Sequence, residues 1–122
     1  MQLVSAIMPY YRKKKYVDNA IISVVNQSYK NLELIIIYDD EDISDFEFLK
    51  SVTQKYKNIR IIKNDCNIGA GQSRNKGIKN ANGNLIAFID ADDVWYSKKV
   101  EKQITYLNEQ NLDFVFCDYL KK

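Results

Sequence analysis

Apolar residues in this chain occur either in short consecutive runs or at helical spacing, and the two patterns alternate. The consecutive runs predict five strands, which cover Leu3–Met8, Leu32–Tyr38, Ile59–Ile62, Leu85–Ile89 and Phe114–Cys117. Between the strands, apolar residues that recur every three or four positions predict one helix from Val17 onward, a second over Ser44–Lys57 and a last one marked by Val100, Ile104 and Leu107. A further helix is expected after the loop that begins at Asn67-Ile68-Gly69, and it runs to about Asn82. Pro9, the only proline, is expected to end the first strand.

Repeated strand–helix units predict an α/β fold. Such units give a mostly parallel sheet with right-handed crossovers and helices on both faces. The consecutive residues Ile35, Ile36 and Ile37 support this fold, because strands that are covered on both faces have continuous apolar runs. The length of 122 residues suits one domain with a real core.

The polar clusters of the chain fall at one edge of the predicted sheet. In sheets of this kind, ligands bind beyond the carboxyl ends of the strands. Four loops follow those ends, and they are Pro9–Lys15, Asp39–Asp45, Asp65–Arg74 and Asp90–Trp95. We therefore expect these loops to form a common binding site.

Three carboxylates, those of Asp90, Asp92 and Asp93, directly follow the fourth predicted strand. Carboxylates this close repel one another unless a positive charge lies among them. The chain has no histidine, and Cys66 and Cys117 are far apart, so the expected counter-charge is a divalent cation held by oxygen, Mg2+ or Mn2+. In the alternative interpretation, these acids simply cap the next helix.

Two other loops carry groups that suit a nucleotide. Asp39 and Asp40 end the second strand, where a carboxylate can accept hydrogen bonds from a nucleobase or ribose, or can cap the following helix. The segment Asn67–Gly77 combines glycines with a helix N-terminus that favours anions, and Arg74 offers a planar fork for phosphate or a base edge. The spacing of its glycines does not match the dinucleotide fingerprint.

Trp95, at the end of the loop with the three carboxylates, could form an apolar wall for a ligand, although an aromatic residue in this position is more often part of the core.

Charge and composition narrow the class of protein. The net charge of +2 and the apolar content of 46% indicate a globular domain and give no sign of a nucleic-acid partner. The two cysteines have no CxxC spacing and follow no secretory signal, so we expect a cytoplasmic protein. The basic run Lys13–Lys15 is expected to be solvated surface, with contact to phosphate or a membrane as the alternative. No apolar run reaches the roughly 20 residues that cross a bilayer, which leaves peripheral membrane attachment open.

Four segments together resemble the nucleotide-binding part of family 2 glycosyltransferases with the GT-A fold. Val4–Tyr11 is similar to the opening strand and its Pro-Thr-Tyr ending, Ser23–Asp40 to the run that ends in paired aspartates, Ser73–Gly77 to the Ala-Arg-Asn-x-Gly element, and Asp90-Ala91-Asp92-Asp93 to the metal-binding Asp-x-Asp motif. The similarity covers essentially the whole chain. The sequence departs from the family where Tyr10 replaces threonine, Arg12 replaces asparagine, and Glu41-Asp42 replaces Gly-Ser.

The resemblance implies transfer of a sugar from a nucleotide-diphosphate sugar, usually a UDP-sugar, to an acceptor hydroxyl, with inversion and with Mn2+ or Mg2+ as cofactor. It implies that Pro9 and Tyr11 line the nucleotide pocket, Asp39 contacts the base, Arg74 holds the nucleotide, Asp90 touches ribose or sugar, and Asp92 binds the metal. It further implies a saccharide or lipid-linked acceptor in polysaccharide biosynthesis, with the full-length enzyme at the inner face of the membrane.

No residue of the chain matches the general base of this family, so we expect that base beyond Lys122. Residues 1–122 are then a truncated GT-A domain, the nucleotide-sugar-binding part without the acceptor-binding half. Such a fragment is expected to bind donor without turnover. Two alternatives stay open: a fragment of a haloacid-dehalogenase-type phosphatase, whose Asp-x-Asp motif also follows an apolar strand, and a non-catalytic nucleotide-binding module.

Overall fold

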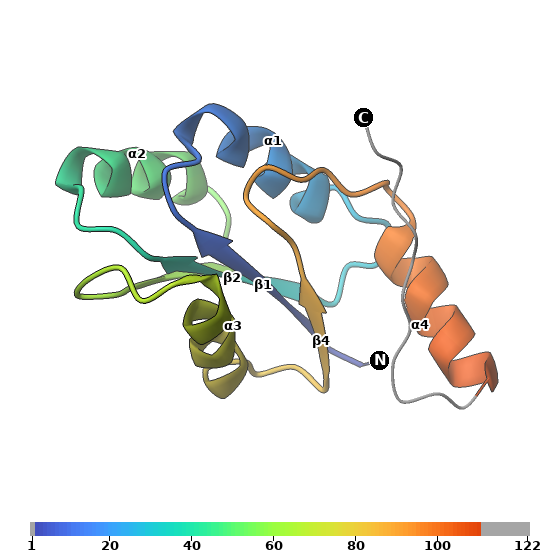
Figure 1. The fold of residues 1–122 in the computed structure, drawn as a ribbon. Helices are drawn as coiled ribbons and strands as arrows, with labels where there is room; N and C mark the ends of the chain where they lie inside the picture. Colours follow the sequence, from blue (N-terminus) through green and yellow to red (C-terminus); the bar gives the residue numbers. More distant parts are fainter. Residues whose placement is uncertain (1, 111–122) are drawn as a thin grey trace.

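The chain folds around a four-stranded parallel sheet, shown in Figure 1 as a computed structural model that describes residues 2–110. Its strands are β1 (Val4–Tyr10), β2 (Leu32–Tyr38), β3 (Ile59–Lys63) and β4 (Leu85–Phe88), in the order β3-β2-β1-β4. Its helices are α1 (Lys14–Val25), α2 (Ile43–Thr53), α3 (Ala70–Lys79) and α4 (Lys99–Gln110). The predicted parallel α/β fold is confirmed. The predicted fifth strand, Phe114–Cys117, lies outside the described residues.

Helices cover both faces of the sheet, as the continuous apolar runs indicated. Alternate residues of β1 and β2, such as Met8 and Ile36, pack in one core with the apolar residues of α1, α2 and α4. Ile7, Ile35 and Ile37 point to the opposite face and form a smaller cluster. Figure 1 shows α1 and α2 on one side of the sheet and α3 on the other. The two central strands are therefore buried on both sides.

The first strand is longer than predicted, because Pro9 does not end it. β1 continues through Pro9 to Tyr10, with Pro9 opposite Ile37 of β2. The backbone of Ile7 faces β4, since its carbonyl accepts a hydrogen bond from the N–H of Ile89. Pro9, two residues later, faces the same side, where β4 has already ended. The missing N–H of Pro9 therefore interrupts no ladder.

Two helices are shorter than predicted. α2 ends at Thr53 rather than Lys57, and the Thr53 hydroxyl donates to the carbonyl of Leu49 at 2.9 Å. α3 ends at Lys79 rather than near Asn82, and the backbone and side-chain N–H groups of Asn80 donate to the carbonyl of Lys76. These hydroxyl and amide side chains bind carbonyls of the last turn, which apolar periodicity does not reveal.

Among residues 2–110, no helix is both long enough and apolar enough to cross a membrane.

Candidate functional site

The four polar loops meet in one cleft at the carboxyl edge of the sheet. This cleft has a volume of about 290 Å3. It is lined by Pro9, Tyr10, Tyr11, Lys13, Asp39, Ala70, Asp90, Ala91 and Asp92, which come from all four predicted loops. The prediction that these four loops come together at one edge of the sheet is therefore confirmed.

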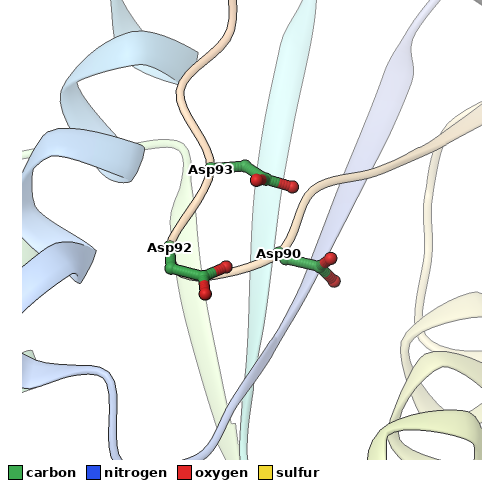
Figure 2. Close-up of side chains that lie close together, drawn as sticks. All are labelled: Asp90, Asp92 and Asp93. Atoms are coloured by element: carbon green, nitrogen blue, oxygen red, sulfur yellow. The ribbon is translucent and has the colours of Figure 1, made fainter. Parts of the chain in front are cut away.

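The carboxylates of Asp90, Asp92 and Asp93 gather on the loop that follows β4 (Figure 2). Each offers an oxygen, and the three oxygens lie within 4.8 Å of one another. A hydrogen bond from the N–H of Asp93 to the carbonyl of Asp90 closes the loop. Such a set of exposed oxygen donors fits a hard divalent cation that keeps other positions for a ligand. The alternative interpretation as helix caps is wrong, because α4 begins at Lys99, well beyond Asp93.

Two cations from other elements reach this acidic loop. Arg74 of α3 places Nη2 3.1 Å from Oδ1 of Asp90. Lys13, at the start of α1, places Nζ 3.5 Å from Oδ2 of Asp92. All four side chains are between 37% and 57% exposed, so each pair is weak and open to exchange with a ligand. The sequence predicted Arg74 for the site, but it assigned Lys13 to solvated surface.

The carboxylate of Asp39 is buried in the wall of the cleft. Oδ1 accepts from the side-chain amide of Asn64 at 2.9 Å and from the N–H of Ile68 at 2.7 Å. Oδ2 accepts from the amide of Asn67 at 3.1 Å and from the N–H of Gly69 at 2.9 Å. Asp39 therefore fixes the loop that leads into α3. Gly69 suits this turn, because its φ of 92° is unfavourable for residues with a side chain.

The interpretation of Asp39 or Asp40 as a helix cap is wrong, because Asp42 caps α2. Oδ1 of Asp42 accepts from the N–H of Asp45 at 2.9 Å and from the hydroxyl of Ser44 at 3.0 Å. The hydrogen bonds to Asp45 and Ser44 lower the pKa of the Asp42 carboxyl. Glu41-Asp42, which departs from the family pattern, thus provides the start of α2.

The two consecutive tyrosines at the end of β1 have different environments. Tyr11 is 41% exposed and lines the cleft, and the guanidinium of Arg12 lies 4.8 Å above its ring. Tyr10 is fully buried, and its hydroxyl donates to the carboxylate of Asp45 at 2.8 Å. Burial, together with this hydrogen bond, raises the pKa of Tyr10 above its ordinary range. The larger side chain that replaces the family's threonine is therefore buried and hydrogen-bonded to Asp45.

Arg12 also holds the loop after β1, since its Nε lies 3.5 Å from Oδ2 of Asp40. Its φ of 52° is unusual for a residue other than glycine, so the loop has a strained turn beside the cleft. Trp95 is only 8% exposed and packs in the main core, which confirms the core interpretation for this residue.

Comparisons with known proteins agree with this architecture. The model of a family described as glycosyl transferase family 2 matches residues 5–122. An uncharacterized glycosyltransferase of Haemophilus influenzae is 35% identical over 97% of this chain and 49% of its own length. The enzyme UDP-Glc:alpha-D-GlcNAc-diphosphoundecaprenol beta-1,3-glucosyltransferase WfgD of Escherichia coli is 37% identical over 96% of the chain and 46% of its own length. The chain thus spans about half the length of these relatives.

Solved structures show the same fold at lower sequence identity. S. aureus TarS 1-349 in complex with UDP-GlcNAc has a TM-score of 0.79 at 22% identity, over 89% of this chain and 32% of that one. The mannosyltransferase PcManGT from Pyrobaculum calidifontis, in complex with GDP-Man and Mn2+, has a TM-score of 0.79 at 15% identity, over 87% of this chain and 32% of that one. These matches confirm the predicted GT-A fold and give no support to the phosphatase alternative. The chain belongs to glycosyl transferase family 2.

Proposed function

We propose that this chain is the donor-binding part of an enzyme that transfers a sugar from a nucleotide-diphosphate sugar, with UDP as the nucleotide, to an acceptor hydroxyl with inversion. The observation that carries the proposal is a cleft lined by Lys13, the buried Asp39 and two carboxylates of the acidic loop. The third carboxylate of that loop, Asp93, lies beside them, and Arg74 pairs with Asp90. A cleft of about 290 Å3 is at the lower limit for a ligand pocket, so it suits one part of a nucleotide sugar.

The acidic loop would hold Mn2+ or Mg2+ through Asp92. The carboxylate of Asp92 lines the cleft and is 43% exposed, and those of Asp90 and Asp93 are near enough to help. When bound, the ion would supply positive charge that neutralises the diphosphate and so stabilises the leaving nucleotide. Asp90, beside Arg74, is placed to touch the ribose or the sugar.

The remaining cleft residues would bind the nucleotide. Pro9 and Tyr11 offer apolar and aromatic surface for the base and ribose. Asp39 would accept the N–H of the base, and its hydrogen bonds hold the carboxylate ready for it. Because each oxygen of this carboxylate already accepts two hydrogen bonds, the base N–H would be a third donor to one oxygen or would replace one of the present donors. Arg74, once released from Asp90, would hold the diphosphate with its planar fork.

The acceptor and the general base belong to the proposed remainder of the enzyme. The relatives are about twice as long as this chain, which supports an acceptor-binding half and a base beyond Lys122. The name of WfgD describes a diphosphoundecaprenol acceptor for that protein. By analogy, we propose a saccharide or lipid-linked acceptor, polysaccharide biosynthesis, and a place at the inner face of the membrane for the full-length enzyme. The chain alone would bind donor without turnover.

Calorimetric titration with UDP, in the presence and absence of Mn2+, tests the proposed site. Wild type should bind UDP more tightly with Mn2+, and Asp92→Asn should weaken metal-dependent binding by at least about ten-fold while UDP binding without metal is unchanged. Asp18→Asn, which removes an exposed carboxylate from α1, is the matched control and should behave as wild type. Equal metal-dependent affinity in Asp92→Asn and wild type would exclude Asp92 as the ligand. Sugar transfer by the full-length protein would then separate a transferase from a non-catalytic module.

A further inference from the structure

Gln27 is a fully buried polar residue just after the last turn of α1. Its side-chain amide bonds to backbone groups far away in the sequence. Nε2 donates to the carbonyl of Tyr96 at 2.6 Å, and Oε1 accepts from the N–H of Val100 at 3.0 Å. Nε2 also donates to the carbonyl of Ser23 at 3.1 Å. Gln27 thus joins the end of α1 to the segment that follows the acidic loop.

Neighbours of Gln27 extend this connection. The hydroxyl of Ser23 accepts from the N–H of Trp95 at 3.0 Å, and the N–H of Ser28 donates to the carbonyl of Ser97 at 2.8 Å. Together with the two bonds of Gln27, they make four hydrogen bonds between the end of α1 and residues 95–100. The ring of Trp95 packs in the core beside them. This part of the chain is therefore firmly attached.

The acidic loop lies between two such attachments. On one side, the N–H of Ile89 donates to the carbonyl of Ile7 at 3.1 Å, at the end of β4. On the other side is the bond from Trp95 to Ser23. The ion pairs of the loop with Lys13 and Arg74 join exposed side chains, and such pairs contribute little to stability. Within the loop, Ala91 is buried in the main core. Asp92 is therefore held between Ala91 on one side and Trp95–Val100 on the other, so a shift of Trp95–Val100 would move Asp92 relative to Ala91.

We propose that Gln27, assisted by Ser23, is a positioning residue that sets the geometry of the acidic loop and thereby the metal affinity of the donor site. This inference rests on the proposed function. The position needs a donor for the carbonyl of Tyr96 and an acceptor for the N–H of Val100 in one side chain, which an amide provides. An ionised glutamate has no donor, and methionine fills the same volume without either bond.

The test compares Gln27→Met with Ser5→Ala, a control near the start of β1 and away from the cleft. Ser5 is also fully buried, and its hydroxyl donates to Glu33 at 2.5 Å and accepts from the N–H of Gly83 at 2.8 Å. Ser5→Ala therefore disturbs a buried polar network away from the cleft. Ser23→Ala is the milder second variant, because it removes the acceptor of the Trp95 N–H and places alanine, a good helix former, in α1.

Two measurements are made on the 122-residue chain, at a temperature where every variant is folded. The first is the affinity for Mn2+ in the presence of UDP, by Mn2+ electron paramagnetic resonance. Gln27→Met should lose several-fold in affinity, less than the roughly ten-fold or more that removal of a direct hydrogen-bond partner of a metal ligand costs, because Gln27 acts on Asp92 through Tyr96 and Val100. Ser23→Ala should lose less, Ser5→Ala should match wild type, and UDP affinity without metal should stay unchanged in all three.

The second measurement records backbone amide shifts without any ligand, which keeps the inference separate from the proposed function. Gln27→Met and Ser23→Ala should shift the amides of Asp90–Asp93, and Ser5→Ala should not. Wild type that binds neither Mn2+ nor UDP would contradict the proposed function while these shifts still report on loop position. If the amides of Asp90–Asp93 move in neither Gln27→Met nor Ser23→Ala, the positioning role of Gln27 would be overturned. A Ser5→Ala loss of Mn2+ affinity equal to that of Gln27→Met would overturn it too.

Discussion

Gly77 of α3 packs closely against Ile7 of the sheet, and replacing Gly77 with alanine should push the helix and the sheet apart. A Cβ at this position would lie 2.4 Å from Cγ2, 3.1 Å from Cγ1 and 3.2 Å from Cδ1 of Ile7. Carbon atoms pack best at about 3.5–4.0 Å, so a shift of about 1 Å is needed. Ile7 is fully buried in β1 and β-branched, and it has little freedom to make this shift.

The size of the effect follows from two opposing contributions. Overpacking a core costs about 1–3 kcal/mol. Glycine to alanine in a helix stabilises by roughly 1 kcal/mol, which offsets part of that cost. Gly71 lies in the first turn of the same helix, and a Cβ there would meet nothing within 4 Å, so Gly71→Ala gains the helix propensity without the clash. The difference between the two variants therefore reports mainly the clash.

Thermal unfolding followed by circular dichroism measures this difference. For a chain of this size, 1 kcal/mol corresponds to roughly 4 °C, so Gly77→Ala should melt roughly 4–12 °C below Gly71→Ala. The site should respond as well, because α3 carries Arg74, whose Nη2 lies 3.1 Å from Asp90. A Gly77→Ala protein that melts as high as Gly71→Ala would refute the close packing of α3 on β1.

Two further predictions concern charge. Burial alone would raise the pKa of Glu33, but hydrogen bonds from Ser5 and Asn82 and the nearby Arg60 lower it below its ordinary value. The ionised form therefore stabilises the fold at pH values above the ordinary pKa, and this stabilisation is lost as the pH falls through the folded-state pKa. Glu33→Gln should have a lower melting temperature than wild type at pH 7, and its melting temperature should fall less between pH 7 and acidic pH. Equal changes of melting temperature with pH in both proteins would contradict the network. Lys13→Gln removes the ammonium 3.5 Å from Asp92, so Mn2+ affinity without nucleotide should rise by up to about five-fold. Lys14→Gln serves as its control, and weaker Mn2+ binding by Lys13→Gln would show that the ammonium does not compete.

Much of the fold could be predicted because its signals are local in sequence. β2 has its predicted bounds, Leu32–Tyr38, since an uninterrupted apolar run identifies a strand that is buried on both faces. Pro9 misled the prediction because the tolerance of a strand for proline depends on the neighbouring strand, and the end of β4 is not visible in the local sequence. The ends of α2 and α3 depend on side-chain hydrogen bonds that apolar spacing does not report.

The location of the site could also be predicted, because it follows from the alternation of strands and helices along the chain. Parallel topology brings four loops to one edge, and so the expected residues Asp39 and Asp92 line one cleft. The contribution of Lys13 was missed because a lysine run is usually solvated, and only the fold places it beside Asp92. Gln27 was missed because its partners are 69 and 73 residues away in the sequence. Long-range polar pairing of this kind leaves no periodic signal in one sequence.

We propose that this cleft binds a nucleoside diphosphate together with a divalent metal. This proposal is tested most directly by backbone amide NMR of the 122-residue chain, titrated with UDP in the presence and absence of Mg2+. UDP should shift the amides of Tyr10–Lys13, Asp39–Asp40, Arg74 and Asp90–Asp93, and these shifts should grow when Mg2+ is present. Amides that do not respond to UDP, GDP or other nucleoside diphosphates, with or without the metal, would contradict it.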